Sequence, residues 1–347
     1  MIKVLVIDDS PLIRGILTEV LKQARDITVV GCAEDPYQAR QMIKTLNPDV
    51  LTLDIEMPKM DGLSFLRNLM RLRPMPVVMI STLTQQGSPA TLEALEIGAI
   101  DFIAKPTLNI ADQLQAYAYT LQEKIRVASQ ARIRAFKPAA NASFQIQGET
   151  EKFDLNAIIA IGASTGGTEA IKEVLMTFPK HAPPTVITQH IPPVFSTSFA
   201  QRMDRCCTVA VKEAEHGDVL ASGQVFIAPG GKHLKIVKRG SVTVCELDDT
   251  APVNRHKPAV DVLFDSLVPM AKSVSAVLLT GMGSDGAKGM LKLRQSGAKT
   301  AAQDEKSSVV WGMPRAAVQL EAAQKVIPLS KVTQTLLYSV AKPCRKV

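Results

Sequence analysis

The sequence predicts an α/β protein made of two doubly wound parallel-sheet domains. Short apolar runs typical of buried strands alternate with stretches of helical periodicity, and this alternation occurs on both sides of a stretch that lacks it. We therefore expect a first domain at 1–125, a linker at 126–152 and a second domain at 153–347. Residues 115–134 are also compatible with a continuation of the first domain's last helix.

In the first domain, strand-like runs alternate with helical stretches such as 11–23. The runs are expected at 2–7, 27–30, 50–53, 77–80 and 100–103. Because parallel neighbours need a crossover between them, this alternation predicts a parallel sheet covered by helices. In such sheets, functional sites collect beyond the carboxyl ends of the strands.

Acidic side chains occupy two of these strand ends. Asp8 and Asp9 follow the first strand, and Asp54 follows the third. Carboxylates that converge repel one another, so their clustering favours a bound cation, and an all-oxygen set suits Mg²⁺.

Groups suited to an anion follow the next two strands. Ser81 and Thr82 come after the fourth strand and Lys105 after the fifth. A single residue of this kind is usually a helix cap or a solvated side chain. Their coincidence with the three acids predicts one site that binds both a cation and an oxyanion.

Four motifs surround these strand ends in the first domain. They are Val-Ile-Asp-Asp-Ser at 6–10, Asp-Ile-Glu-Met-Pro-Lys-Met-Asp-Gly at 54–62, Gly-Ala-Ile-Asp-Phe at 98–102 and Lys-Pro at 105–106. Through these motifs residues 1 to about 125 resemble a response-regulator receiver domain. The resemblance implies a flavodoxin-like fold in which Asp54 accepts a phosphoryl group from a histidine kinase.

The same resemblance suggests roles for the residues around Asp54. Asp8, Asp9 and Asp54 are expected to bind Mg²⁺, and we add the neighbouring acid Glu56 to these ligands. Lys105 would pair with the phosphoryl oxygens. Ser81 would sense them, with Thr82 as the competing hydroxyl.

Composition and charge limit the remaining function classes. We find no signal peptide and no apolar run long enough to span a bilayer, so we expect a cytoplasmic protein without membrane insertion. The cysteines lack C-x-x-C spacing, which argues against a zinc site or a disulfide framework. Residues 153–347 hold 23 Lys and Arg against 16 Asp and Glu. This excess suits an acidic protein partner, whereas the scattered cations without interleaved aromatics argue against nucleic acid.

The second domain is organised around Gly-Ala-Ser-Thr-Gly at 162–166, which lies between the apolar run 157–161 and a helical stretch at 168–178. The glycines beside Ser164 match the nucleophile-elbow pattern, in which small neighbours permit a tight turn. A glycine-rich loop before a helix can instead bind phosphate. The role of Ser164 therefore depends on the residues that could activate it.

His190 and Asp285 are the residues predicted to activate Ser164. His190 ends the strand-like run 184–189, and Asp285 follows the run 276–279. The carboxyl ends of parallel strands share one edge of a sheet, so the three side chains can meet. His190 would take the serine proton and later protonate the leaving alcohol, while Asp285 would orient the imidazole.

Two alternatives compete with this triad. His256, in Asn-Arg-His-Lys-Pro at 254–258, is a rival base, but its cationic neighbours would lower its basicity and suit it better to an acidic substrate. Residues 281–286 also spell G-x-G-x-x-G, with Asp304 beyond them, as in a dinucleotide-binding domain. A receiver fused to a dinucleotide-binding or DNA-binding output is thus the alternative, although no helix-turn-helix pattern supports DNA binding.

Five longer motifs occur between about residue 153 and residue 340. They are Ile-Gly-Ala-Ser-Thr-Gly-Gly at 161–167, Gln-His-Ile-Pro-Pro-Val-Phe-Ser-Thr-Ser-Phe-Ala at 189–200, Ile-Ala-Pro-Gly-Gly-Lys-His at 227–233, Arg-His-Lys-Pro-Ala-Val-Asp-Val-Leu-Phe at 255–264 and Leu-Thr-Gly-Met-Gly-Ser-Asp-Gly at 279–286. Through these motifs the segment resembles the catalytic domain of the chemotaxis protein-glutamate methylesterase family. The resemblance implies a Rossmann-like esterase domain.

It also implies a nucleophilic Ser164, a basic His190, an orienting Asp285 and an oxyanion contact from the Met282 backbone, to which we add Thr165. The expected substrates are methylated glutamates on the cytoplasmic domains of chemoreceptors, and receptor glutamines would be deamidated. We expect a phosphorylation-activated serine hydrolase that releases methanol during chemotactic adaptation. Mg²⁺ is expected for receiver phosphorylation, and no cofactor for ester hydrolysis.

Overall fold

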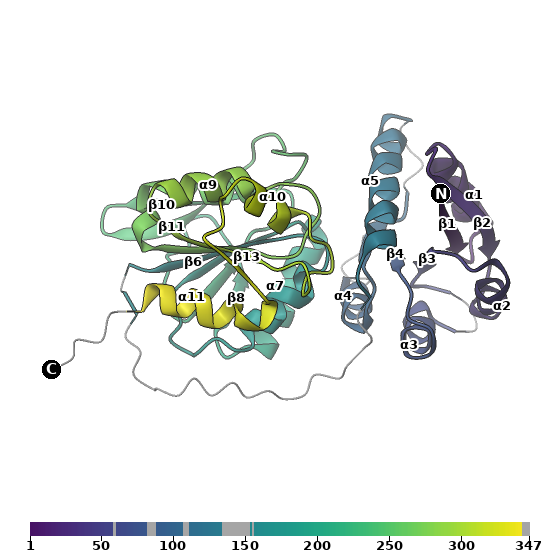
Figure 1. The fold of residues 1–347 in the computed structure, drawn as a ribbon, viewed down its shortest axis with the longest axis horizontal. Helices are drawn as coiled ribbons and strands as arrows, with labels where there is room; N and C mark the ends of the chain where they lie inside the picture. Colours follow the sequence, from purple (N-terminus) through teal and green to yellow (C-terminus); the bar gives the residue numbers. More distant parts are fainter. Residues whose placement is uncertain (58–59, 82–87, 107–110, 134–152, 155, 342–347) are drawn as a thin grey trace. The chain divides into compact units, whose positions relative to one another are not determined.

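The computed structural model describes residues 1–57, 60–81, 88–106, 111–133, 153–154 and 156–341. The chain forms two compact units, Met1–Ala140 and Asn141–Val347, each built on a parallel β-sheet with helices against it (Figure 1). This confirms the predicted fold class. Among the described residues, no helix combines the length and the apolar character needed to cross a bilayer.

The first unit contains a sheet with the strand order β2-β1-β3-β4-β5, in which all neighbouring strands are parallel. Its strands are β1 (Ile2–Ile7), β2 (Ile27–Ala33), β3 (Val50–Asp54), β4 (Val77–Ser81) and β5 (Asp101–Ala104). The order changes direction between β1 and β3. Ligand sites of open α/β sheets form at such a point, and the predicted acids lie there.

Five helices connect these strands: α1 (Pro11–Lys22), α2 (Pro36–Leu46), α3 (Gly62–Leu72), α4 (Ser88–Ile97) and α5 (Ala111–Gln130). Local sequence explains where several of them begin. Asp35 caps α2 by accepting hydrogen bonds from two backbone N–H groups, and Asp61 caps α3 in the same way through the Ser64 N–H, 2.8 Å away. Helix α5 continues to Gln130, so it includes the first residues of the stretch predicted as the linker.

The second unit contains a larger sheet with the order β14-β13-β12-β6-β7-β9-β8, again with every pair parallel. Its strands are β6 (Ile158–Ala163), β7 (Thr185–Gln189), β8 (Ala210–Glu213), β9 (Gln224–Ile227), β12 (Val274–Leu278), β13 (Lys299–Gln303) and β14 (Lys325–Ile327). Strand β6 is central and buried along its whole length, which explains its continuous apolar sequence. In the register of the sheet, Ile161 lies between Val277 of β12 and Ile187 of β7.

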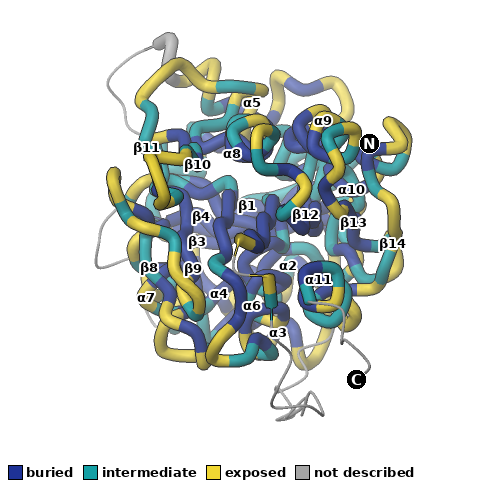
Figure 2. Tube along the Cα trace, turned by 90° about the vertical axis from the view of Figure 1, so that its left-hand side faces the viewer, coloured by how far each residue is buried: buried dark blue, intermediate teal, exposed yellow. Residues whose placement is uncertain are grey.

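The sheet of the second unit is accompanied by helices and by an antiparallel hairpin that the sequence did not predict. The helices are α6 (Gly167–Leu175), α7 (Pro193–Cys206), α8 (Val260–Leu267), α9 (Ala287–Gln295), α10 (Met313–Gln319) and α11 (Val332–Val340). The hairpin pairs β10 (His233–Arg239) with β11 (Val242–Asp248). Residues of the central strands are mostly buried, whereas many loop residues are exposed (Figure 2). One apolar core thus joins α8, α9 and the hairpin to the sheet.

Candidate functional site

The strand order brings the predicted triad to one edge of the second sheet. Ser164 directly follows β6, His190 directly follows β7, and Asp285 lies in the loop between β12 and α9. Strand β6 lies between β7 and β12. The His190 N–H donates to the Ala163 carbonyl (3.1 Å) and the Ser164 N–H to the Thr280 carbonyl (3.0 Å), which ties the three loops together.

Two glycines in the turn after Ser164 cannot be replaced by larger residues. Gly166 has a φ of +75°, and a Cβ at this position would lie 2.7 Å from the Val309 Cβ. A Cβ at Gly167 would lie 2.1 Å from Oε1 of Gln189. Positive φ and close approach both require glycine, so the turn that carries Ser164 depends on this sequence.

His190 and Asp285 form a buried pair. The imidazole Nε2 lies 2.8 Å from the carboxylate Oδ2, and the two side chains are 7% and 1% exposed. Among the described residues, none offers a hydrogen-bond partner to His190 Nδ1, which is also buried. With Nε2 engaged by the carboxylate, Nδ1 is the nitrogen left to accept a proton.

Asp285 is held by more than the histidine. Oδ1 accepts hydrogen bonds from Asn254 Nδ2 (2.7 Å) and from the Asp261 N–H (3.2 Å), and Oδ2 accepts one from the Val260 N–H (2.6 Å) at the start of α8. Burial alone would raise the pKa of Asp285. The hydrogen bonds from His190, Asn254 and Val260, together with the charge of His190, outweigh burial and lower the pKa to about 2. The carboxylate is therefore ionised at neutral pH.

Sequence reasoning missed three polar side chains of this site. Asn254 also donates to Asp261 Oδ2 (2.8 Å), and Asp261 Oδ1 accepts from the Gly289 N–H (2.7 Å). Behind the serine, Gln189 Nε2 donates to the Ser164 carbonyl (2.9 Å). Gln189 and Asp261 lie within the quoted motifs, and Asn254 directly precedes one, but the pattern alone does not reveal these contacts.

The two predicted oxyanion residues flank the serine from different loops. Thr165 is buried next to Ser164, and its carbonyl accepts a hydrogen bond from the Thr280 hydroxyl (3.0 Å). Met282 follows Gly281, whose carbonyl accepts the N–H groups of Gly312 (3.0 Å) and Met313 (2.8 Å). Both loops are thus fixed in place by hydrogen bonds.

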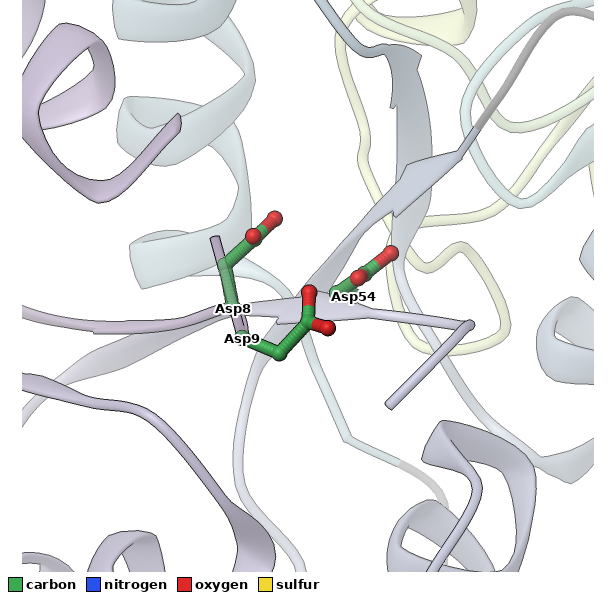
Figure 3. Close-up of side chains that lie close together, drawn as sticks. All are labelled: Asp8, Asp9 and Asp54. Carbon is green, nitrogen blue, oxygen red and sulfur yellow. The ribbon is translucent and has the colours of Figure 1, made fainter. Parts of the chain in front are cut away.

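A second site lies in the first unit, where three predicted acids converge. Ligand oxygens of Asp8, Asp9 and Asp54 all lie within 4.8 Å of one another (Figure 3). Asp8 and Asp54 are buried, and Asp9 is exposed. Asp8 Oδ2 is buried without a hydrogen-bond partner among the described residues, so a hard cation that seeks carboxylate oxygens fits this group.

Lys105 contacts the same acids. Its Nζ lies 2.8 Å from Asp54 Oδ2 and 3.7 Å from Asp8 Oδ2. Burial raises the pKa of Asp54 to about 6, and the hydrogen bond from Lys105 only partly opposes this rise. Burial also raises the pKa of Asp8, so the pair carries more negative charge than its surroundings readily support.

The remaining residues predicted for this site differ in their placement. Glu56 is exposed, and its carboxylate is not part of the acidic group; its backbone N–H lies 3.3 Å from Asp54 Oδ1 instead. Ser81 is buried at the end of β4, with its hydroxyl 2.7 Å from the hydroxyl of Thr91 in α4, a contact that the sequence did not predict. Thr82 lies outside the described residues.

The dinucleotide-binding alternative finds no support at its acidic residue. Asp304 Oδ1 accepts hydrogen bonds from the Ser307 N–H (2.9 Å) and hydroxyl (2.6 Å), so this carboxylate stabilises the turn at 304–307. In a dinucleotide-binding fold the corresponding acid must instead face the ribose of the ligand.

Comparison with known proteins matches two families to two parts of the chain. The CheB methylesterase family matches residues 159–336, and the response regulator receiver domain matches residues 4–118. Protein-glutamate methylesterase/protein-glutamine glutaminase 2 of Cupriavidus pinatubonensis is 52% identical over 98% of this chain and 96% of its own length. The enzyme of the same name from Vibrio vulnificus is 54% identical over 96% of this chain and 97% of its own.

A solved structure leads to the same conclusion for the second unit. The catalytic domain of the Thermotoga maritima CheB methylesterase is similar with a TM-score of 0.51 and 37% identity, covering 52% of this chain and 97% of that domain. The relatives extend this similarity to nearly the full length. The chain belongs to the protein-glutamate methylesterase/protein-glutamine glutaminase family, with an N-terminal receiver domain and a C-terminal methylesterase domain.

Proposed function

We propose that this chain hydrolyses glutamate methyl esters, with Ser164 as the nucleophile, His190 as the base and Asp285 as the residue that orients the imidazole. The observation that carries the proposal is the 2.8 Å contact between His190 Nε2 and Asp285 Oδ2, at strand ends on either side of the Ser164 turn. The names of the relatives, protein-glutamate methylesterase/protein-glutamine glutaminase, support the substrate class.

The reaction begins when the Ser164 oxygen attacks the ester carbonyl and His190 Nδ1 accepts the serine proton. The carbonyl electron pair moves onto oxygen, where backbone N–H groups of Met282 and Thr165 stabilise the charge. The tetrahedral intermediate then collapses, and methanol leaves with the proton from Nδ1. Water attacks the acyl-enzyme in the same way, which releases a glutamate carboxylate and restores Ser164. A glutamine side chain follows the same path with ammonia as the leaving group.

Asp285 contributes through its charge. When His190 takes the serine proton it becomes a cation, and a carboxylate at 2.8 Å stabilises that cation in a water-poor site. The low pKa of Asp285, about 2, keeps the carboxylate available throughout the working pH range. The residue thus favours the transition state without exchanging a proton itself.

We propose that Asp54 is phosphorylated by a histidine kinase and that this activates the second domain. Asp8, Asp9 and Asp54 would hold Mg²⁺, which supplies positive charge beside the incoming phosphoryl oxygens. The Lys105 ammonium lies 2.8 Å from Asp54 and would pair with the phosphoryl oxygens once Asp54 carries them. Ser81 is our candidate for the hydroxyl that responds to them, and to do so it must leave Thr91.

The proposed substrates are the cytoplasmic domains of chemoreceptors, which places the enzyme in the cytoplasm. The names of the relatives support a protein substrate that carries glutamate esters and glutamines. The excess of Lys and Arg over Asp and Glu in residues 153–347, 23 against 16, favours an acidic partner.

Methanol release from methyl-labelled receptor membranes tests this proposal. We expect the wild-type protein to release methanol, Ser164→Ala to release none, and both to melt at the same temperature, because only the nucleophilic oxygen is lost. A phosphodonor should accelerate the wild type and leave Asp54→Asn unchanged. Full turnover by Ser164→Ala would show that the triad assignment is wrong.

A further inference from the structure

A tight turn beside the triad links residues that contact two of its members. The Val253 N–H donates to the His256 carbonyl (3.1 Å), and the His256 N–H donates to the Val253 carbonyl (2.9 Å). Between them, Asn254 and Arg255 both have left-handed backbone conformations, with φ of +53° and +69°. This pattern is typical of a two-residue turn of type I′, which fixes the directions of the side chains that it carries.

Asn254 uses its amide to join two carboxylates. Nδ2 lies 2.7 Å from Asp285 Oδ1 and 2.8 Å from Asp261 Oδ2, so both donor hydrogens of the amide are used. An uncharged donor between two acids satisfies both without adding a third charge. Asp285 is thereby held at Oδ1 while Oδ2 faces His190.

His256 contacts the other member of the pair. Its ring stacks on the His190 ring, with centroids 3.6 Å apart and an angle of 11° between the planes. A flat ring at this distance opposes rotation of the His190 imidazole about its Cβ–Cγ bond. That rotation matters because only one ring orientation directs Nε2 to Asp285 and leaves Nδ1 for the serine.

The segment that carries the turn is anchored at both ends by a buried histidine. His233 Nε2 lies 3.1 Å from the Ala251 carbonyl, and the Ala259 N–H donates to His233 Nδ1 at 3.1 Å. The Gly231 N–H adds a hydrogen bond to the Lys257 carbonyl (3.1 Å). These anchors allow the turn to hold its contacts with the triad in a fixed position.

We propose that Asn254 and His256 are positioning residues of the catalytic pair. Asn254 fixes the carboxylate of Asp285 through Oδ1, and His256 fixes the plane of the His190 imidazole. Both act through another residue. The inference rests on the proposed function for the roles of His190 and Asp285, so it is tested with a readout that does not need the proposed substrate.

The test measures the rate at which a fluorophosphonate labels Ser164 in the full-length protein, together with kcat and KM for methyl ester hydrolysis. Asn254→Gly removes the side-chain amide, and glycine adopts the left-handed backbone conformation without strain. We expect labelling and kcat to fall by about tenfold to a hundredfold, as for loss of a hydrogen bond to a charged group, with KM unchanged. Glu321→Gly is the matched control, because Glu321 also has a positive φ, +54°, and lies outside the site; it should be labelled at the wild-type rate.

Asn254→Asp separates a positioning role from a purely structural one. Aspartate has the same shape and tolerates the left-handed turn, but its carboxylate cannot donate to Asp285 and adds a third negative charge. We expect a loss of labelling at least as large as in Asn254→Gly, measured well below the melting temperature of the variant, which the repulsion among three carboxylates should itself lower. Wild-type labelling rates in either Asn254 variant would overturn the role given to this residue.

For His256 the matched pair is His256→Phe and His256→Ala. Phenylalanine keeps a flat ring against His190, so labelling should stay near the wild-type rate, whereas alanine should lower it about three- to tenfold. Equal losses in the two variants would overturn the stacking role. A wild type that is labelled but releases no methanol would contradict the proposed function alone. A wild type that releases methanol, with unimpaired Asn254→Gly, Asn254→Asp and His256→Ala variants, would contradict this inference alone.

Discussion

Gly281 lies so close to Ser164 that a Cβ on the glycine would stand 2.8 Å from the serine Cβ and 3.0 Å from its backbone nitrogen. The same Cβ would lie 2.4 Å from Met313 Sδ. A side chain at this position can therefore be accommodated only if the serine turn or its neighbours move.

We predict that Gly281→Ala lowers kcat by about a hundredfold, because a displacement of roughly 1 Å at a reacting atom has that effect. Overpacking should also cost about 1–3 kcal/mol in the free energy of unfolding. Kinetics and urea denaturation measure the two effects. Gly15→Ala is the control, because a Cβ at Gly15 meets no neighbouring atom within 4 Å and its φ is not positive; its kcat should be that of the wild type. An unchanged kcat in Gly281→Ala would contradict the close packing.

Acid unfolding should report the ionised state of Asp285. Its pKa in the folded protein is about 2, below the value of about 3.9 for an unfolded chain. A depressed pKa stabilises the fold fully above about pH 4 and loses that contribution as pH falls toward 2. We expect Asp285→Asn to lose stability less steeply over this window in urea denaturation at stepped pH. Equal slopes for wild type and variant would count against a strongly ionised Asp285.

Metal should shift the titration of Asp54. Without metal the pKa is about 6, so the carboxyl is protonated below that pH and ionised above it. Mg²⁺ favours the charged form, so we expect the midpoint, followed by NMR of the side-chain carboxyl carbon, to move to lower pH on addition of Mg²⁺. Lys105→Met should move the metal-free midpoint upward, since the lysine hydrogen bond lowers it. A midpoint that does not respond to Mg²⁺ would argue against a metal site at these acids.

The Ser81–Thr91 contact should set the sensitivity to phosphorylation. The two hydroxyls lie 2.7 Å apart and are buried, so a Ser81 that turns toward a phosphoryl group gives up this hydrogen bond. Thr91→Val removes the partner and keeps the shape. Because such a bond contributes about 1 kcal/mol net, we expect half-maximal activation at roughly fivefold lower phosphodonor concentration. A higher requirement than in the wild type would show that Ser81 does not move in this way.

Salt should weaken hydrolysis of the receptor substrate. The second domain is basic, and an acidic methylation region would be attracted over about a Debye length, ~10 Å at 0.1 M salt. We expect KM to rise with ionic strength while kcat stays nearly constant. Fluorophosphonate labelling of Ser164 should be unaffected and serves as the control. A KM that does not depend on salt would refute this electrostatic account without affecting the catalytic one.

The triad could be proposed from sequence because strand ends are local features. Apolar runs indicate where β6, β7 and β12 end, and the carboxyl ends of parallel strands lie at one edge of the sheet, so Ser164, His190 and Asp285 could be assigned to the same edge. The contacts of Asn254 could not be derived in this way. They depend on two left-handed residues and on the path of a loop between distant strands, neither of which produces a periodic pattern.

Three strands of the second sheet were missed for a related reason. Strands β8, β9 and β14 have only three or four residues each, too few for periodicity to distinguish them from loops. Glu56 was predicted as a metal ligand because it is an acid two residues from Asp54. Its exposed carboxylate remains outside the acidic group, since a side chain two positions beyond a strand end need not turn toward the site.

Val260 lies against two glycines, and its backbone supports the carboxylate of Asp285. A Cβ at Gly162 would lie 2.4 Å from Val260 Cγ1, and a Cβ at Gly286 would lie 2.6 Å from the same atom. The Val260 N–H donates to Asp285 Oδ2. A methyl group added to either glycine would therefore displace Val260 at the start of α8, and with it the N–H group that donates to Asp285. Libraries that seek a wider substrate range should therefore hold Gly162 and Gly286 constant and vary exposed loop positions instead, since a side chain at either position would displace the residue that supports Asp285.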